Sequence, residues 1–264
     1  MISTTDQTRP TMAQREARLR SVLQQQGEAS VALLSAEMGV SEMTLRRDLD
    51  RLERTGLVRR THGGAVLAER LGFAFDFASR RRANQKAKQA IATEAAKLVK
   101  PGCAVLLDAG TTTLQLAEIL SDAENLVVVT PSLAVASALQ FSEGVKTILL
   151  GGVLRRGTPD LTGEVAEAAL GMLAVDIAFQ GADGIGLDGS LYTGDLGTAR
   201  LDQRIRERAA RTYVLADSTK VGRTALARHG SLREMSGWIT DRGIQAEQLK
   251  ALRKLGVPIT IVKA

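Results

Sequence analysis

The spacing of apolar and polar residues predicts three helices near the start of the chain. The first spans Thr11 to Gln25 and is ended by Gly27, and the second runs from Ser30 to Glu37. Ser41 is expected to cap a third helix that ends at Arg54, because a serine oxygen accepts a hydrogen bond from the free amides of a first turn. The pattern therefore predicts a small helical domain.

Residues 57–66 read as two short strands around the glycine turn Gly63-Gly64. Three helices followed by such a hairpin predict a winged helix-turn-helix over residues 1–66. Residues 67–83 are expected to form a linker to a second domain, residues 84–264.

The second domain begins with an expected helix from Asn84 to Val99, ended by Pro101-Gly102. Apolar, β-branched runs then alternate with helical patterns, at 104–107, 126–129, 147–150, 177–179, 212–215, 237–240 and 258–262. Strands that alternate with helices predict an α/β fold with a mostly parallel sheet covered on both faces.

The composition fits a folded protein, with 44% hydrophobic and 24% charged residues. One cysteine excludes an internal disulfide, and the polar start of the chain has no apolar stretch of the signal-peptide type. The apolar runs are far shorter than the roughly 18 residues that span a bilayer. We therefore expect a cytoplasmic protein without a membrane partner.

The formal net charge of +6 permits a polyanionic partner. Basic residues gather in two stretches, which are candidates for phosphate contact: Arg46, Arg47, Arg51, Arg54, Arg59 and Arg60, and then Arg80, Arg81, Arg82, Lys86 and Lys88.

The third helix has the pattern of a recognition helix. Leu45, Leu49 and Leu52 share one face, and Met43 and Arg47 lie opposite, together with Arg54. Such a helix enters the major groove with its N-terminal residues, while longer arginines neutralise phosphates. An ordinary solvated helix is the alternative, because acidic residues on the same helix balance much of its charge.

Several motifs resemble the DeoR-type transcriptional regulators. In the first domain they are Gln14-Arg15, Gly39-Val40-Ser41, Thr-Leu-Arg-Arg-Asp-Leu at 44–49 and Arg-Thr-His-Gly-Gly-Ala at 60–65. The resemblance continues through residues 88–92, 108–113, 151–152, 217–220 and 239–241, and so covers nearly the whole chain.

This resemblance implies a repressor of a sugar or polyol catabolism operon, controlled by a phosphorylated sugar that binds the second domain. The partner is then a double-stranded DNA operator, bound by a homodimer or homotetramer because symmetric half-sites add affinity. The expected DNA-binding residues are Ser41, Met43, Thr44, Arg46, Arg47, Arg51, Arg54, Arg60 and His62, although a lone histidine at a turn is more often structural.

The second domain offers a candidate phosphate site where the first strand of its sheet meets a helix. Asp108 to Thr113 form a loop of small residues before that helix, where free amides, the helix dipole and hydroxyls favour an anion. Threonine as a simple helix cap is the alternative. Loops at the carboxyl ends of parallel strands converge on one crevice, so residues far apart in sequence can share one site. The expected effector-binding residues are Arg80, Lys88, Asp108, Gly110, Thr111, Thr112, Thr113, Thr130, Ser132, Gly151, Gly152, Asp183, Asp217 and Lys220.

Other candidate chemistry is rejected. Residues 184–189 fit Gly-x-Gly-x-x-Gly, but no helical pattern follows, so we interpret them as a surface turn and expect no nucleotide cofactor. Two distant histidines and one cysteine cannot build a usual zinc site, so no metal is expected. Cys103 reads as a small core residue, and His229 stands alone among turn residues.

An enzyme is the main rival function, because the sensor domain of this family resembles ribose-5-phosphate isomerase. Isomerisation needs a carboxylate base, yet the chain has Gln180 and Gly197-Thr198-Ala199 where the isomerase pattern has acids, so no catalytic residue is expected. Thr198, Gln203 and Pro131 also depart from the DeoR pattern, which leaves the identity of the effector open. A ligand-independent DNA-binding or docking protein is the third possibility.

Overall fold

In the computed structural model, the chain divides into two compact units, residues 1–76 and 77–264. The structure describes residues 10–26, 28–54, 57–61, 63–67, 77–155 and 157–263. Within these ranges no helix is both long enough and apolar enough to cross a membrane.

The first unit is the expected winged helix-turn-helix. Its elements are α1 (Met12–Gln26), β1 (Glu28–Ser30), α2 (Val31–Met38), α3 (Glu42–Arg54), β2 (Val58–Arg60) and β3 (Gly64–Leu67). The strands form an antiparallel sheet in the order β1-β3-β2. The three helices bury Leu23, Leu34, Leu45 and Leu49 completely in one core.

The local sequence explains where the helices of this unit begin. Ser30 caps α2 by accepting the amide of Leu33 (3.2 Å), and Ser41 accepts the amide of Thr44 at the start of α3 (3.3 Å). Strand β1 was not predicted, because three residues give no alternating pattern. It lies so close to β3 that a Cβ at Gly64 would stand 2.1 Å from the carbonyl oxygen of Ala29.

The second unit contains a seven-stranded sheet in which all neighbouring strands are parallel. Its order is β15 (Ile259–Val262), β14 (Gly237–Asp241), β12 (Thr212–Leu215), β9 (Ile177–Gln180), β4 (Ala104–Leu107), β5 (Leu126–Thr130) and β6 (Val145–Leu149). Each of the seven apolar runs in the sequence forms one of these strands, which confirms the predicted fold class.

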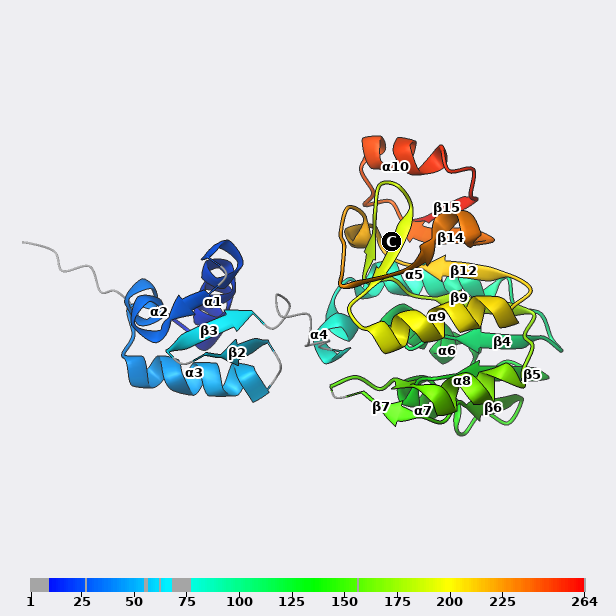
Figure 1. The fold of residues 1–264 in the computed structure, drawn as a ribbon, viewed down its shortest axis with the longest axis horizontal. Helices are drawn as coiled ribbons and strands as arrows, with labels where there is room; N and C mark the ends of the chain where they lie inside the picture. The colour runs from blue at the N-terminus through cyan, green and yellow to red at the C-terminus, as the bar shows by residue number, and fades with distance from the viewer. Residues whose placement is uncertain are drawn as a thin grey trace, which may run out of the picture. The chain divides into compact units, whose positions relative to one another are not determined.

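Helices cover both faces of this sheet. They are α4 (Phe77–Arg82), α5 (Gln85–Ala96), α6 (Thr111–Leu120), α7 (Leu133–Leu139), α8 (Glu164–Gly171), α9 (Leu196–Arg208) and α10 (Ala246–Arg253). In β4, Val105 and Leu107 pack in a core with α5, α6 and α7, whereas Leu106 packs in a second core with α8 and α9. This alternation is the two-residue period of a strand buried on both sides, and Figure 1 shows α8 and α9 running across one face.

Smaller elements complete the unit. Antiparallel pairs are formed by β7 (Val153–Leu154) with β8 (Leu161–Thr162), and by β11 (Ser190–Thr193) with both β10 (Gly184–Ile185) and β13 (Ala227–Ser231). Two single turns of 3-10 helix are η2 (Ser218–Lys220) and η3 (Leu232–Glu234). Strand β11 follows residues 184–189, where a dinucleotide motif requires a helix.

The structure differs from four expectations. The helix predicted to reach Val99 ends at Ala96, and a separate helix, α4, precedes it inside the expected linker 67–83. His229 does not lie among turn residues: it sits in β13 and is 1% exposed. Residues 184–189 are not wholly a surface turn, because Gly184 and Ile185 form a buried strand.

Candidate functional site

In the first unit, α3 presents the face that the sequence predicted. Leu45, Leu49 and Leu52 are buried in the core, whereas Met43 is 66% exposed and Arg47 is exposed beside it. Ser41 and Thr44 form the helix cap, with their hydroxyl oxygens 2.9 Å apart. A surface formed by the first turns of α3 is therefore open to a partner of this unit.

Most other cations around α3 are engaged within the unit. Arg46 pairs with Glu42 (3.2 Å), Arg51 with Glu16 (3.4 Å) and Arg60 with Asp50 (2.5 Å). Arg47 has no ion-pair or hydrogen-bond partner in the part of the unit that the structure describes. His62 and the side chain of Arg54 lie outside the described residues.

In the second unit, the residues predicted to bind a phosphate lie in the loop after β4 and in the first turn of α6. Gly110 is the N-cap residue, with an extended backbone and no side chain of its own to satisfy the free amides. Thr113 donates its hydroxyl to the carbonyls of Asp108 (2.6 Å) and Gly110 (2.8 Å), which holds the loop. Thr111 and Thr112 are buried in the same turn.

The loop after β9 joins this site through Asp108. One oxygen of the Asp108 carboxylate accepts the amide of Gly181 (3.1 Å), and the other accepts the amide of Ala109 (2.6 Å). Burial raises the pKa of Asp108 to about 6, although the two amides oppose the shift. The ends of β4 and β9 are therefore tied together by one buried carboxyl group.

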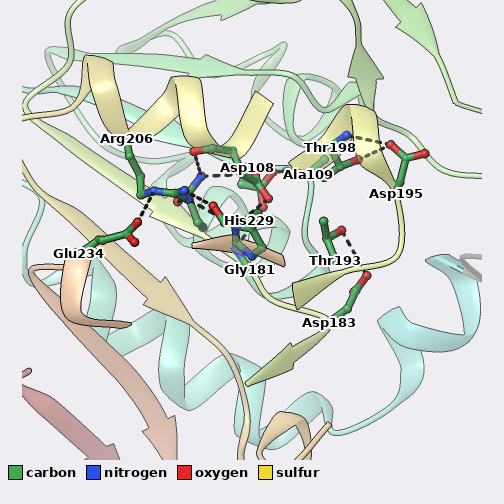
Figure 2. A network of polar contacts seen from close by, with 12 residues as sticks. Asp108, Ala109, Gly181, Asp183, Thr193, Asp195, Thr198, Arg206, His229 and Glu234 are labelled. Atoms are coloured by element: carbon green, nitrogen blue, oxygen red, sulfur yellow. Dashed lines mark hydrogen bonds and ion pairs between the residues drawn. The ribbon is translucent and has the colours of Figure 1, made fainter. Parts of the chain in front are cut away.

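Asp183 adds an acceptor that already holds a cation. Its carboxylate accepts the amide of Gly194 (2.8 Å) and the hydroxyl of Thr193 (3.4 Å), and it pairs with Arg80 of α4. Burial raises its pKa, but Arg80 and the amide of Gly194 lower it by more, so the pKa lies below its ordinary value. Figure 2 shows Asp183 beside Thr193.

Lys88, Asp217 and Lys220 lie near these groups. Lys88 is 4% exposed, and its burial lowers its pKa to about 8 while the charge of Asp217 opposes the shift. Asp217 accepts the amide of Thr219 (3.0 Å) and the side-chain amide of Asn84 (3.2 Å). Burial also lowers the pKa of Lys220, against the attraction of Asp183 and Asp217. The structure thus gathers three cations, including Arg80, around two aspartates.

Structural roles account for most of the remaining residues that were predicted to bind the effector. Thr130 donates to the carbonyl of Leu107 (2.7 Å) and accepts the amide of Ser132, and Ser132 caps α7. Gly151 and Gly152 are exposed between β6 and β7. Gly152 has a φ of 128°, and a Cβ there would stand 2.5 Å from a carbonyl oxygen, so a backbone requirement already explains this glycine.

Sequence reasoning missed three charged residues between β7 and α9. Arg155 pairs with Asp160 (2.8 Å) and with Asp195 (3.2 Å), the residue that caps α9. Asp160 also contributes to the raised pKa of Asp108. Only Asp195 had a signal in the sequence, since Asp three residues before Thr198 is a capping pattern, and Thr198 donates its amide to Asp195 (2.8 Å).

A buried polar network on α9 and β13 was missed as well. Gln180 donates to the main-chain carbonyl (2.9 Å) and the carboxylate (3.3 Å) of Asp202, and Arg206 donates to Gln180 (3.2 Å). His229 lies 3.3 Å from Asp202 and from Arg206, and Arg206 also pairs with Glu234 (3.5 Å). Figure 2 shows this network next to Asp108 and Gly181.

Burial shifts the pKa values of two residues in this network. It raises the pKa of Asp202 well above its ordinary value, with the nearby Asp108 adding to the shift. Burial and then the Arg206 charge lower the pKa of His229 to about 4. Gln203, one of the departures from the family pattern, is exposed on the same helix, and Pro131 is buried in the loop after β5. Among the described residues no group of acidic, histidine and cysteine side chains could hold a metal ion.

Two family models match the chain. The "DeoR-like helix-turn-helix domain" matches residues 15–70, and the "DeoR C terminal sensor domain" matches residues 83–242. Among solved structures, ribose 5-phosphate isomerase A of Methanocaldococcus jannaschii is 23% identical, with a TM-score of 0.40 over 53% of this chain and 55% of that chain.

Three curated relatives match over most of their length. The putative aga operon transcriptional repressor of Escherichia coli O157:H7 is 34% identical over 95% of this chain and 94% of its own. The L-fucose operon activator of Haemophilus influenzae is 33% identical (83% and 88%), and the glycerol-3-phosphate regulon repressor of Escherichia coli K12 is 32% identical (86% and 90%). With both of its units matched in this order, the chain belongs to the DeoR family of transcriptional regulators.

Proposed function

We propose that this regulator binds an operator of a sugar or polyol catabolism operon and that a phosphorylated sugar or polyol, bound by its second unit, controls it. The observation that carries the proposal is the combination of a winged helix-turn-helix with a second unit in which the first-turn amides of α6 have no side-chain cap and aspartates and cations lie nearby. Relatives that are named for the aga operon, the L-fucose operon and the glycerol-3-phosphate regulon support the same proposal. The DNA-binding role supports a cytoplasmic location, which is part of this proposal.

The DNA-binding part of the proposal rests on α3. Its leucine face is fixed in the core of the first unit, so Met43 and Arg47 point outward where a major groove can receive them. One such helix contacts few base pairs, and we therefore propose that a homodimer or homotetramer binds two symmetric half-sites.

The effector part rests on the chemistry of the second unit. The first-turn amides of α6 and the hydroxyls of Thr111 and Thr112 suit a phosphate. Asp183 is an acceptor for sugar hydroxyls, and Lys220 adds positive charge for the phosphate. All of these groups belong to one unit and lie at the carboxyl edge of its sheet, where α/β folds bind ligands.

We propose binding without turnover. Both oxygens of Asp108 already accept backbone amides, which makes this carboxyl a structural brace rather than a base facing substrate. Gln180, at the position of an expected acid, is fully buried and bonded to Asp202 and Arg206. The hydroxyl of Thr198 donates a hydrogen bond to Asp195, the residue that caps α9, and threonine cannot act as a carboxylate base.

Thermal unfolding with a panel of compounds tests the effector. The panel contains ribose 5-phosphate, fructose 6-phosphate and glycerol 3-phosphate, with ribose, fructose, glycerol and inorganic phosphate as matched controls. A bound compound at 100 times its Kd stabilises the protein by about 2.7 kcal/mol, so one phosphorylated member should raise the Tm clearly. Equal shifts with its unphosphorylated counterpart, or interconversion of ribose 5-phosphate and ribulose 5-phosphate at an enzymatic rate, would contradict the proposal.

Gel shifts with the upstream region of the chain's own gene test DNA binding at low salt. A shift that competitor DNA of unrelated sequence does not abolish supports an operator-binding role. Absence of any shift with the wild-type protein would overturn it, whatever the thermal panel gives.

A further inference from the structure

Helix α4 is short, and side-chain contacts hold it against the rest of the second unit. It spans six residues, Phe77–Arg82, and its last turn is closed by the amide of Ala83, which donates to the carbonyl of Ser79 (3.0 Å). Helices this short are unstable in water without packing or other attachments. Phe77 packs against the main core of the second unit, and the rest of α4 is attached through polar contacts.

The first polar attachment joins α4 to the proposed effector site. Arg80 pairs with Asp183, whose carboxylate also accepts the amide of Gly194. The side chain of Asp183 is 14% exposed and that of Arg80 is 35% exposed, so this ion pair is partly shielded from water. Asp183 cannot give its full acceptor capacity to a sugar hydroxyl while it holds Arg80.

The second attachment is made by a buried ammonium group. Lys88 of α5 donates to the carbonyls of Arg80 and Ala83 (2.5 Å), at the C-terminal end of α4. A cation at a helix C-terminus satisfies free carbonyls and interacts favourably with the helix dipole. The same ammonium lies within electrostatic range of Asp217 and Lys220.

Because of these contacts, α4 and a bound ligand would compete for the same charged groups. A phosphate attracts the Arg80 and Lys88 cations, and a ligand hydroxyl that donates to Asp183 replaces the guanidinium there. We propose that α4 is a latch, closed in this structure by the Arg80–Asp183 pair and the Lys88 ammonium, which a phosphorylated polyhydroxy effector opens. This inference rests on the proposed function, because it gives the effector site its mechanical output.

The place of α4 in the chain gives the latch its consequence. It is the first helix of the second unit along the chain, and residues 1–76 precede it. Opening it would release the residues of one short helix into the segment that joins the first unit to α5. Effector binding can therefore change DNA binding without any change in the seven-stranded sheet.

Hydrogen exchange of the full-length protein, followed by mass spectrometry over residues 77–84, tests the latch. Arg80→Gln removes the pair with Asp183 and keeps the length of the side chain. Without any ligand, we expect it to speed exchange of the α4 amides about tenfold, the change for about 1.4 kcal/mol of lost attachment. Arg81→Gln is the matched control, because Arg81 pairs with Glu118 (3.0 Å) at an exposed position on the same helix and should change exchange less than about twofold.

The ligand arm uses whichever compound of the thermal panel raises the Tm. That compound should speed exchange of the same amides in the wild type, whereas inorganic phosphate at a concentration that gives no Tm shift should not. If a compound raises the Tm but leaves exchange of residues 77–84 unchanged or slower, the latch is overturned and the effector site stands. If no compound binds, the proposed effector is wrong. The comparison of Arg80→Gln with Arg81→Gln still tests the latch, because equal exchange rates of residues 77–84 in the two variants would overturn it.

Discussion

At the scale of single residues, Thr112 offers a direct test of the effector site. It lies buried in the first turn of α6, where a phosphate is expected. Thr112→Glu places a fixed negative charge there and should weaken effector binding by about tenfold or more, since like charges a few ångströms apart repel by more than about 1 kcal/mol at a protein surface. Operator binding should not change, because the first unit is untouched.

Titration calorimetry with the effector and gel shifts without it measure the two effects. Thr93→Glu is the control, because Thr93 is exposed on α5 and the substitution adds the same charge outside the proposed site. A Thr112→Glu protein that binds effector like the wild type would mean that the phosphate lies elsewhere.

His229 gives a pH-dependent prediction. Its pKa is about 4 in the folded protein, against about 6.5 when unfolded, so the unfolded chain binds the proton first as the pH falls. The stability that neutral His229 contributes is therefore complete above pH 6.5 and lost progressively toward pH 4, by about 3 kcal/mol. Asp108 and Asp202 have raised pKa values and act in the opposite sense over an overlapping range.

The difference between wild type and His229→Gln isolates the histidine, because both proteins keep those carboxyl groups. Urea unfolding should show the wild type as the more stable protein at pH 7, with the difference shrinking as the pH falls to 5. A difference that is constant with pH would show that His229 does not change its charge on unfolding.

At the scale of elements, the arginines of α3 differ in whether they form ion pairs within their unit. Arg47 is exposed, with no partner in the described part of its unit, whereas Arg51 is held by Glu16. Arg47→Ala should cost about 1 to 3 kcal/mol of operator binding if it contacts a base, and it should relax the sequence preference at one position.

Arg51→Ala is the matched control on the same helix. It should weaken operator and unrelated DNA alike, and by less, because its charge is partly neutralised within the unit. Competition gel shifts with operator variants measure both effects. If Arg51→Ala causes the larger loss of specificity, the face assigned to α3 is wrong.

At the scale of the whole molecule, the proposed function requires symmetry. We expect light scattering after size exclusion to give twice or four times the mass of one chain, and footprinting to protect two half-sites about one helical turn apart or a multiple of it. A monomer at concentrations that saturate the operator, or a footprint over a single half-site, would contradict this expectation.

The sequence by itself determined the secondary structure that makes up the cores of the two units. Leu45, Leu49 and Leu52 mark the inner face of α3, and seven apolar runs mark the strands of the large sheet, because burial forces apolar residues into the period of each element. Helix starts were also local, as the caps at Ser30, Ser41 and Ser132 show. The loop from Asp108 to Thr113 could be placed at a helix start for the same reason.

Only the tertiary structure decided the partners of the polar residues. The pairs Arg80–Asp183 and Lys88 with the end of α4 join segments that no local pattern relates, and Gln180, Asp202 and His229 meet from three different elements. Strands such as β1 and β13 form because a neighbouring strand supplies their hydrogen bonds, not because apolar residues recur along their own sequence. Charge states follow the same rule, since burial, which raises the pKa of Asp108 and lowers that of His229, exists only once the chain has folded.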